Sequence, residues 1–579
     1  MRPYIIALRR FGFFALAATL ALPLLAWGDE RAADNIVRGT SAPVGQGGMV
    51  VAQEALAARI GADILQKGGN AIDAAVAVGF TLAVTFPRAG NIGGGGFMVI
   101  HLANGTDTTI DYRETAPAGI HAKSFLDETG NADPGKSRDS ALAVGVPGTV
   151  AGLALAEQKY GSGKFTLAEL IAPAIALAQD GVTLTEDAAA VLVNRRLVRW
   201  PSSAKIFQKS DGGALGRGDR LVQAELADSL RAIARDGPRA FYQGPIAEKI
   251  AVAVLSAGGV MTVDDLRNYQ ATERAPVRGS YRGYDIISMA PPSSGGVGLI
   301  EMLNILEGYD LGAIAHSDEA KAMHLLVEVM KRAYADRTLF LGDPDRVQNP
   351  VALLTSKAYA AGWRAGIDPV HATAAADIRA GGTVQPEGRN TTHFSVIDRF
   401  GNAVANTYTL NFNFGVGLVA EGTGILLNNE LDDFAAKPYV PNAFGLLGAE
   451  ANEPGPGKRP LSSMTPAILL KDGKPFLITG SPGGSRIITT VLQIIVNVID
   501  RGMDIAAAVA APRIHDQWMP DQVYAEPDVP EAVIAALQAG GDKVVAQPPF
   551  TSANSIMITP KGFVGAADPR SRDALAVGF

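Results

Sequence analysis

The residue of this chain best suited to nucleophilic chemistry is Thr391, in the run Asn390-Thr391-Thr392-His393-Phe394. A threonine hydroxyl is a weak nucleophile until a base takes its proton, and the α-amine of an N-terminal threonine is one such base. That amine has a pKa of about 7.7 to 8.0, so a large fraction is unprotonated near neutral pH. If the chain is cut before Thr391, one residue supplies both nucleophile and base. The alternative interpretation is an ordinary threonine at the start of a strand.

Two glycine runs also contain residue types that could serve a reaction. Acyl transfer passes through an oxyanion that needs two aimed N–H donors, and consecutive glycines let backbone amides approach it unhindered. Gly483-Gly484 meet this requirement, although the same residues can form a simple Pro-Gly-Gly turn after a strand. The run over 93–96 lacks the Lys-Ser/Thr pair of a phosphate loop and the dinucleotide-binding spacing. We therefore predict close backbone packing at this second run.

The elements that would position these residues differ on the two sides of a loop. Residues 377–390 are polar, contain Gly and Pro and show no period, which predicts an exposed loop directly before Thr391. Helix signals dominate before this loop, and strand signals follow it. The expected helices lie over 54–67, over 71–82 behind an Asn70 cap, after the capping boxes at Thr166 and Thr262, and over 318–336. The expected strands are 394–398, 403–409, 424–428, 476–479, 555–559 and 563–565.

The N-terminus has the pattern of a secretory signal. Three arginines lie within the first ten residues, and an uncharged run follows over 11–25. The residues Ala26-Trp27-Gly28 then precede the acidic pair Asp29-Glu30, which is the layout of a cleavable signal. The uncharged run is too short to span a bilayer comfortably, and an uncleaved anchor is the alternative. We expect residues 1–28 to be a cleaved signal peptide, leaving an exported protein without a stable membrane span.

Charge and composition exclude several classes of function. The 579 residues are 47% hydrophobic and 19% charged, which is typical of a globular protein. The net charge is −7, and about −10 without the three N-terminal arginines, so nucleic acid is not an expected partner. Cysteine is absent, which excludes disulfides and thiol catalysis. The seven histidines show no metal-binding spacing, so we expect neither a metal nor a cofactor.

The sequence that follows residue 390 resembles the small-subunit signature of the γ-glutamyltranspeptidase family. It reads Thr-Thr-His-Phe-Ser-Val, then Gly401-Asn402, then Thr407-Tyr-Thr409-Leu-Asn411. The resemblance continues through Leu-Asn-Asn-Glu430-Leu-Asp-Asp433-Phe, Arg459-Pro-Leu-Ser462-Ser463, Gly480-Ser-Pro-Gly483-Gly484-Ser-Arg486, Asp568-Pro-Arg570-Ser and, earlier in the chain, Gly69-Asn70-Ala-Ile-Asp-Ala, Gly90-Asn-Ile-Gly-Gly-Gly-Gly and Asp111-Tyr-Arg113-Glu. It therefore covers nearly everything after the signal.

This resemblance implies an α+β fold of the N-terminal-nucleophile hydrolase type, a four-layer αββα sandwich. Members of the family cut themselves into two subunits that build the sandwich jointly and remain together as a heterodimer. Here the cut would fall between Asn390 and Thr391. The large subunit would be residues 29–390 and the small, catalytic subunit residues 391–579.

The resemblance also assigns roles to single residues. Thr391 would be the nucleophile, Thr409 would hydrogen-bond its hydroxyl, and Gly483 and Gly484 would form the oxyanion hole. His393 lies on the same face of a strand as Thr391, but the family does not use it in catalysis, so we expect it to be structural.

A γ-glutamyl donor carries an α-carboxylate and an α-ammonium, and each charge needs a partner once it leaves water. The residues expected to hold the carboxylate are Arg113, Ser462 and Ser463. The residues expected to hold the ammonium are Asn411, Glu430 and Asp433. Judged without the resemblance, such an arginine and a Glu-x-x-Asp pair are more often solvated surface charges.

Two positions bear on substrate choice. The segment 438–448 resembles the lid that covers the pocket in many bacterial members, which usually carry Tyr where this chain has Phe444. The hydrogen bond that fastens the lid in those members is therefore in question here, while the aromatic wall remains. Glu430 stands where some members have Gln, and its carboxylate adds attraction for the substrate ammonium.

Together these features predict a self-cleaving γ-glutamyltransferase and glutathione hydrolase. It would pass a γ-glutamyl group from glutathione or other γ-glutamyl compounds, through an ester on Thr391, to water, an amino acid or a dipeptide. We expect it in the periplasm of a Gram-negative source and otherwise outside the cell. The alternatives are a glutaryl-cephalosporin acylase of the same family, whose donor lacks the ammonium, and a γ-glutamyl-binding protein without catalysis.

Overall fold

The computed structural model describes residues 42–378 and 391–579. The predicted signal over 1–28 and the predicted cleavage residue Asn390 lie outside the described residues, together with most of the loop expected before Thr391. Within the described residues, no helix is both long enough and apolar enough to cross a membrane.

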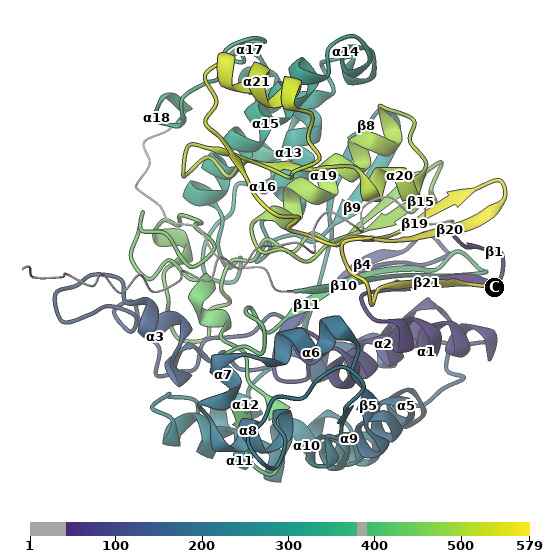
Figure 1. Ribbon diagram of the computed structural model, residues 1–579, viewed down its shortest axis with the longest axis vertical. Coiled ribbons are helices and arrows are strands. Elements are labelled where there is room, and N and C mark those ends of the chain that lie inside the picture. Colours follow the sequence, from purple (N-terminus) through teal and green to yellow (C-terminus); the bar gives the residue numbers. More distant parts are fainter. Residues whose placement is uncertain (1–41, 379–390) are drawn as a thin grey trace, which may run out of the picture. The chain divides into compact units, whose positions relative to one another are not determined.

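Two seven-stranded sheets are stacked face to face at the centre, with helices on both outer sides (Figure 1). In spatial order, the first sheet consists of β21 (Leu575–Gly578), β2 (Gly48–Ala52), β10 (Thr392–Asp398), β11 (Ala403–Thr409), β3 (Gly95–His101), β4 (Asp107–Asp111) and β7 (Thr272–Arg274). The second consists of β1 (Val44–Gly45), β20 (Gly562–Ala567), β19 (Asn554–Thr559), β15 (Lys474–Thr479), β14 (Ala467–Lys471), β9 (Tyr284–Ser288) and β8 (Val277–Tyr281).

Each sheet has its own helical layer. The first sheet is covered by α1 (Ala55–Gln66), α2 (Ala71–Thr85), α4 (Thr149–Tyr160), α5 (Leu167–Asp180), α9 (Ala224–Asp236), α10 (Pro238–Tyr242), α11 (Pro245–Ser256) and α12 (Val263–Arg267). The second is covered by α13 (Gly295–Leu306), α14 (Leu311–Ser317), α15 (Glu319–Phe340), α17 (Lys357–Ala365), α19 (Arg486–Ile499), α20 (Ile505–Ala510) and α21 (Glu531–Ala539). The αββα sandwich and the α+β class are therefore confirmed.

Short elements complete the structure. They are α3 (Pro134–Arg138), α6 (Glu186–Leu192), α7 (Arg195–Val198), α8 (Pro201–Phe207), α16 (Val351–Leu354), α18 (Ala375–Ile378), β5 (Val182–Thr183), β6 (Arg220–Leu221), β12 (Val419–Ala420), β13 (Ile425–Leu426), β16 (Ile514–His515), β17 (Val523–Ala525), β18 (Val544–Ala546) and the 3₁₀ turns Ala141–Ala143, Glu430–Asp433 and Glu450–Asn452.

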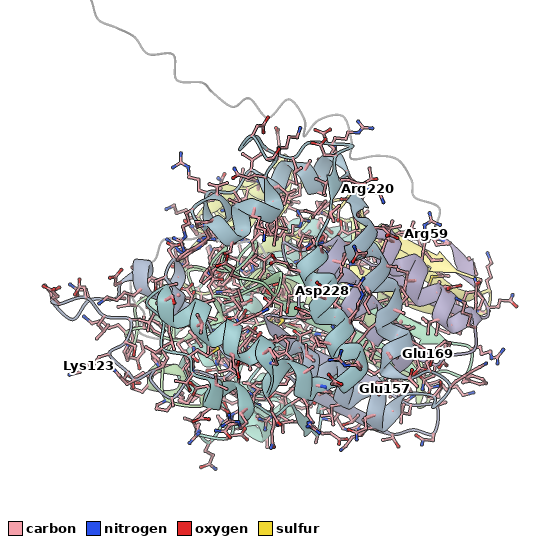
Figure 2. All side chains as sticks on the ribbon, turned by 90° about the horizontal axis from the view of Figure 1, so that it is seen from below. Arg59, Lys123, Glu157, Glu169, Arg220 and Asp228 are labelled. Atoms are coloured by element: carbon pink, nitrogen blue, oxygen red, sulfur yellow. The ribbon has the colours of Figure 1, made fainter. Side chains whose placement is uncertain are left out.

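Three apolar layers hold the sandwich together, one between the sheets and one under each helical layer. Strand β10 contributes to two of them, because successive side chains of a strand point to opposite faces. Phe394 and Val396 pack toward α1 and α2, whereas Ile397 packs between the sheets. The outer faces of the helices carry charges such as Glu169 and Asp228, which point to solvent (Figure 2).

Local sequence signals identified several helix ends correctly. Asn70 and Asp73 form a capping box at the start of α2, and Thr166 and Thr262 do the same for α5 and α12. The long helix predicted over 318–336 continues to Phe340, and the β10–β11 hairpin lies where it was expected.

The distribution of strands differs from the prediction. Seven of the fourteen strands in the two large sheets, β1 to β4 and β7 to β9, precede the loop, in the part of the chain where helix signals dominate and no strand range was predicted. The reason is burial: β2 and β3 are covered on both faces, so they lack the alternation by which a half-exposed strand is recognised. The strand expected over 424–428 is shorter, since only Ile425–Leu426 pairs.

Candidate active site

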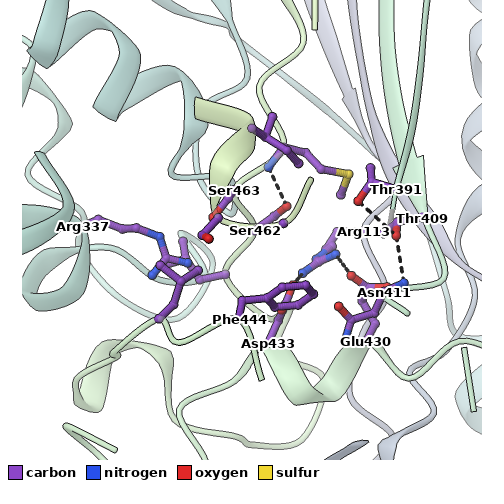
Figure 3. Close-up of a pocket in the computed structure, with 16 residues that line it drawn as sticks. Arg113, Arg337, Thr391, Thr409, Asn411, Glu430, Asp433, Phe444, Ser462 and Ser463 are labelled. Atoms are coloured by element: carbon purple, nitrogen blue, oxygen red, sulfur yellow. Dashed lines mark hydrogen bonds and ion pairs between the residues drawn. The ribbon is translucent and has the colours of Figure 1, made fainter. Parts of the chain in front are cut away.

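Thr391 lies where the chain enters β10, and its hydroxyl is 3.5 Å from that of Thr409 (Figure 3). The register causes this contact, because the pairing of Thr392 with Tyr408 places Thr391 opposite the last residue of β11. The backbone N–H of Asn411 donates to the Thr409 hydroxyl at 2.8 Å. The two threonines are therefore neighbours across the strand pair, as expected.

The glycine run at the start of β3 packs against the backbone of the strand that carries Thr409. The side-chain amide of Asn91 donates to the Thr409 carbonyl at 2.8 Å, and its oxygen accepts the N–H of Gly94 at 2.8 Å. A Cβ at Gly94 would overlap the same Thr409 carbonyl, and one at Gly96 would overlap the carbonyl of Thr407. The predicted close backbone packing is confirmed, and it fixes the strand that carries Thr409.

A buried ion-pair group lies next to the threonines. Arg113 follows β4, and its guanidinium donates to both Glu430 and Asp433, while its Nε donates to the Pro460 carbonyl at 3.1 Å. Sequence reasoning assigned the arginine to a substrate carboxylate and the two acids to a substrate ammonium. In the structure these groups pair with one another, so they are buried charges and not the solvated surface charges of the alternative interpretation.

Burial and charge act against each other in this group. Burial raises the pKa of both Glu430 and Asp433, and the adjacent Arg113 charge opposes that rise. Burial acts to lower the pKa of Arg113, but the negative charges of the two acids raise it overall. The arginine therefore remains charged.

Ser462 and Ser463 line the same pocket from the segment before β14. The Ser462 hydroxyl accepts the N–H of Met464 at 3.1 Å, and the backbone of Ser462 forms an isolated β-bridge with Ser293. Among the described residues, neither the Ser463 hydroxyl nor Oε2 of Glu430 has a hydrogen-bond partner, although both are buried. Buried polar groups are rarely left unpaired, so these atoms indicate where a ligand would bind.

Gly483 and Gly484 connect β15 to the start of α19. Their φ angles are 134° and 58°, a region that disfavours residues with a side chain. Gly484 and Ser485 line the pocket, whereas Gly483 stands behind them against Thr551. The amides at the first turn of α19 offer the positive end of a helix to a developing oxyanion.

Phe444 closes the pocket from the predicted lid segment. Its ring stacks on that of Phe412, with 5.3 Å between the centroids and 20° between the planes. A Cβ at Gly484 would overlap the Phe444 ring, and Gln517 donates to the Phe444 carbonyl at 3.1 Å. Stacking and backbone contacts thus hold this segment over the pocket.

His393 is structural, as expected. Its ring is fully buried and contacts the hydroxyls of Thr407 and Ser395 at 2.8 and 3.1 Å. Burial lowers its pKa to about 3, so it is neutral at ordinary pH. A Cβ at Gly480 would overlap the ring, which shows that the imidazole fills space between the sheets.

Arg337, on α15, is a pocket residue that sequence reasoning missed (Figure 3). A signal for it exists in the helix, because Met323, Val327, Met330 and Tyr334 form one buried stripe at spacings of three and four. Arg337 occupies the next position of that stripe. An amphipathic pattern predicts apolar residues along such a buried stripe, so the burial of the Arg337 charge must have another cause.

The pocket between these side chains is narrow, with a cavity volume of about 20 Å³. All the predicted site residues that the structure describes line it except Gly483, namely Thr391, Thr409, Gly484, Arg113, Asn411, Glu430, Asp433, Ser462 and Ser463. Over residues 42–378 and 391–579, no cluster of three or more His, Cys, Asp or Glu side chains could ligate a metal ion.

Comparison with known proteins agrees with this geometry. The family model described as gamma-glutamyltranspeptidase matches residues 57–578. The glutathione hydrolase proenzyme of Escherichia coli K12 is 49% identical over 582 residues, covering 100% of this chain and 99% of that protein. The acylase ACY 1 proenzyme of Pseudomonas sp. strain SE83 is 40% identical over 536 residues, covering 90% and 92%. Among solved structures, a cephalosporin acylase from Bacillus halodurans aligns with a TM-score of 0.81 at 27% identity, covering 95% and 99%.

The matches cover both described parts of the chain, including the strands that carry the two threonines. Sequence identities of 40% and 49% over nearly the full length show a common family and not only a common fold. The chain is therefore an enzyme that belongs to the γ-glutamyltranspeptidase family.

Proposed function

We propose that this chain is a precursor that cuts its own Asn390–Thr391 bond and then acts as a γ-glutamyltransferase and glutathione hydrolase. The observation that carries this proposal is the position of Thr391. It stands at the start of β10, beside Thr409, in the pocket that contains Arg113 and its two acidic partners.

Self-cleavage begins when Oγ1 of Thr391 attacks the carbonyl carbon of Asn390. The peptide C–N bond breaks as the C–O bond forms, so an ester replaces the amide and the α-amine of Thr391 is released. Water then hydrolyses the ester and frees the hydroxyl. Thr409 lies within 3.5 Å of that hydroxyl and can hydrogen-bond it in both steps.

In the mature enzyme the free α-amine takes the proton of the Thr391 hydroxyl. The oxygen attacks the γ-carbonyl of the donor, the amides near Gly484 stabilise the oxyanion, and the leaving amine receives the proton. A γ-glutamyl ester remains on Thr391. Water or the amine of an amino acid or dipeptide then attacks this ester and restores the hydroxyl.

Recognition of the donor would use the ion-pair group beside Thr391. A substrate ammonium can replace part of the Arg113 contact to Glu430 and Asp433, which frees the guanidinium for the substrate carboxylate. Oε2 of Glu430 and the Ser463 hydroxyl, which lack protein partners among the described residues, gain hydrogen bonds in that exchange. Glutathione is the proposed donor, in line with the name of the Escherichia coli relative.

We also propose a heterodimer of residues 29–390 and 391–579, exported after removal of residues 1–28. The proenzyme names of the relatives support two-chain maturation, and the arginine-rich, then uncharged N-terminus supports export. The location would be the periplasm of a Gram-negative source and otherwise the outside of the cell.

Replacement of the nucleophile tests the proposal. A Thr391→Ala chain is expected to remain uncut and inactive, while a Thr392→Val control, which removes the adjacent buried hydroxyl, is expected to be cut. Intact-mass measurement before and after incubation with a γ-glutamyl p-nitroanilide shows both the cut and the ester. Two fragments from purified Thr391→Ala would refute self-cleavage by this residue.

The acylase alternative differs in one substrate group. A glutaryl donor lacks the ammonium and would leave Glu430 and Asp433 without a counter-charge from the ligand. Release of p-nitroaniline from γ-glutamyl and glutaryl anilides is expected to favour the γ-glutamyl donor. A preference for the glutaryl anilide would reverse the assignment.

A further inference from the structure

Arg337 is a buried cation that the catalytic scheme does not use. It is 4% exposed and forms no ion pair with a carboxylate of the described residues, although the more distant charge of Asp433 opposes the lowering of its pKa. Its Nε donates to the Ser294 hydroxyl at 3.0 Å, and one terminal nitrogen makes a long contact of 3.4 Å to the Leu447 carbonyl. Burying a guanidinium with so few partners is costly unless an anion completes the site.

The guanidinium is connected to the serine segment of the pocket. Ser294, its hydrogen-bond acceptor, donates its own hydroxyl and its backbone N–H to the Ser462 carbonyl at 2.7 and 2.8 Å. Arg337 and Arg113 approach the pocket from opposite sides (Figure 3). Ser463, whose buried hydroxyl is unpartnered among the described residues, lines the space with them.

Charge balance indicates what this site accepts. The pocket lining contains two guanidinium groups, Arg113 and Arg337, and two carboxyl groups, Glu430 and Asp433. When all four groups are ionised, the three that remain without Arg337 carry one excess negative charge, which favours a simple cation. Glu114, 3.8 Å from Arg113 but outside the lining, adds no charge at neutral pH because burial raises its pKa to about 8. With Arg337 the charges balance, which matches a ligand that carries one carboxylate and one ammonium.

We propose that Arg337, together with the Ser463 hydroxyl, forms a second carboxylate-binding group that binds the α-carboxylate of the donor from the side away from Arg113. This inference rests on the proposed function and adds a specificity-determining residue to it. Burial lowers the pKa of Arg337 only to about 10, so its side chain remains charged near neutral pH.

Three p-nitroanilides separate this role from a structural one. The γ-glutamyl compound has both charged groups, the glutaryl compound has only the carboxylate, and the 4-aminobutanoyl compound has only the ammonium. KM and kcat are measured for each, or an inhibition constant where turnover is too slow. The variants are Arg337→Gln, Arg337→Lys and the control Arg332→Gln, which removes a buried arginine of the same helix that pairs with Glu328.

We expect Arg337→Gln to lower kcat/KM for both carboxylate-bearing donors by about 10- to 100-fold, mainly through KM, as for loss of a charged hydrogen bond. The 4-aminobutanoyl compound is expected to change by less than about 2-fold. Arg337→Lys, which keeps the charge but not the fork, is expected to lose about 3- to 10-fold on the same two donors. The Arg332→Gln control is expected to leave the ratios among the three donors unchanged.

An equal loss on all three donors, or none on the carboxylate-bearing pair, overturns the proposal. If Arg337→Gln is not matured, the same comparison is made with Arg337→Lys, for which equal changes on all three compounds are equally decisive. Failure of the proposed function has a different signature, because the unmodified enzyme itself would then not release p-nitroaniline from the γ-glutamyl donor.

Discussion

The ring of Phe412, just after β11, stacks on the ring of Phe444 in the lid. This contact links the strand that carries Thr409 to the segment that covers the pocket. Stacked aromatic pairs contribute about 0.5 to 1.5 kcal/mol beyond the area they bury. The side chain of Phe444 is therefore held by a nonpolar contact, which does not depend on a tyrosine hydroxyl.

A Phe412→Ala variant is expected to loosen the lid without removing any group of the ion-pair cluster. KM for a γ-glutamyl anilide should rise about 2- to 10-fold, in line with the loss of one stacked pair. Limited proteolysis within 438–448 should become faster. A Phe412→Leu control keeps most of the volume, and equal protease sensitivity in the alanine variant and the parent would contradict the stacking role.

A Thr409→Val variant is expected to slow self-cleavage. Valine has the shape of threonine but cannot hydrogen-bond the Thr391 hydroxyl or accept from the Asn411 N–H. Loss of one neutral hydrogen bond costs about 0.5 to 1.5 kcal/mol, which corresponds to about a 2- to 10-fold slower reaction. The time course of precursor disappearance on a denaturing gel measures this. A Thr409→Ser chain, which keeps the hydroxyl, should be cut faster than the valine variant.

Asp433→Asn is expected to alter the choice between donors. The change removes one negative charge from the group around Arg113 and weakens the contact to a substrate ammonium. A charged hydrogen bond is worth about 1.5 to 3 kcal/mol, so kcat/KM for the γ-glutamyl anilide should fall about 10- to 100-fold. The glutaryl anilide, which has no ammonium, should lose much less. A parallel loss on both anilides would show that the residue acts on the fold and not on the ammonium.

Acid should destabilise the protein through its buried histidines. Burial lowers the pKa of His393 and of His515 to about 3, so both stay neutral in the folded state. In the unfolded chain both histidines take up protons below about pH 6.5. Because the folded state does not bind these protons, their uptake stabilises the unfolded state, and the effect grows as the pH falls toward 3. At pH 5.5 each histidine should cost about 1.4 kcal/mol of stability.

Urea unfolding at pH 7.5 and 5.5 measures this effect. A His393→Gln variant should be less stable at pH 7.5, because the ring fills space between the sheets, yet lose less stability between the two pH values. A variant whose pH dependence equals that of the parent would show that His393 does not carry the linkage.

Most of the pocket was predicted through the resemblance to the γ-glutamyltranspeptidase family, because the motifs that contain Thr391, Ser462 and Gly484 match that family together. The sequence did not reveal that Arg113 pairs with the acids expected to bind the opposite end of the substrate, since pairing depends on the fold. Arg337 was hidden in an otherwise apolar helix stripe. Phe412 was hidden because its partner lies in a distant loop.

The strands show the same limit. β10 and β11 were recognised because a turn signal joins them, whereas β2, which pairs with β10, is a fully buried five-residue run without polar alternation. Polar and apolar residues alternate along a strand only when one of its faces is exposed to solvent. A strand at the centre of a four-layer sandwich has no exposed face, so its sequence lacks this alternation.

Both central sheets combine strands from before and after residue 390: β2 pairs with β10, β11 with β3, and β14 with β9. After the proposed cut, the two products would share one folding unit and could separate only by unfolding. Refolding would then be a bimolecular search in place of a unimolecular one. The mature enzyme would persist because its unfolding is slow, and its lifetime would depend on that barrier more than on the equilibrium stability of either chain.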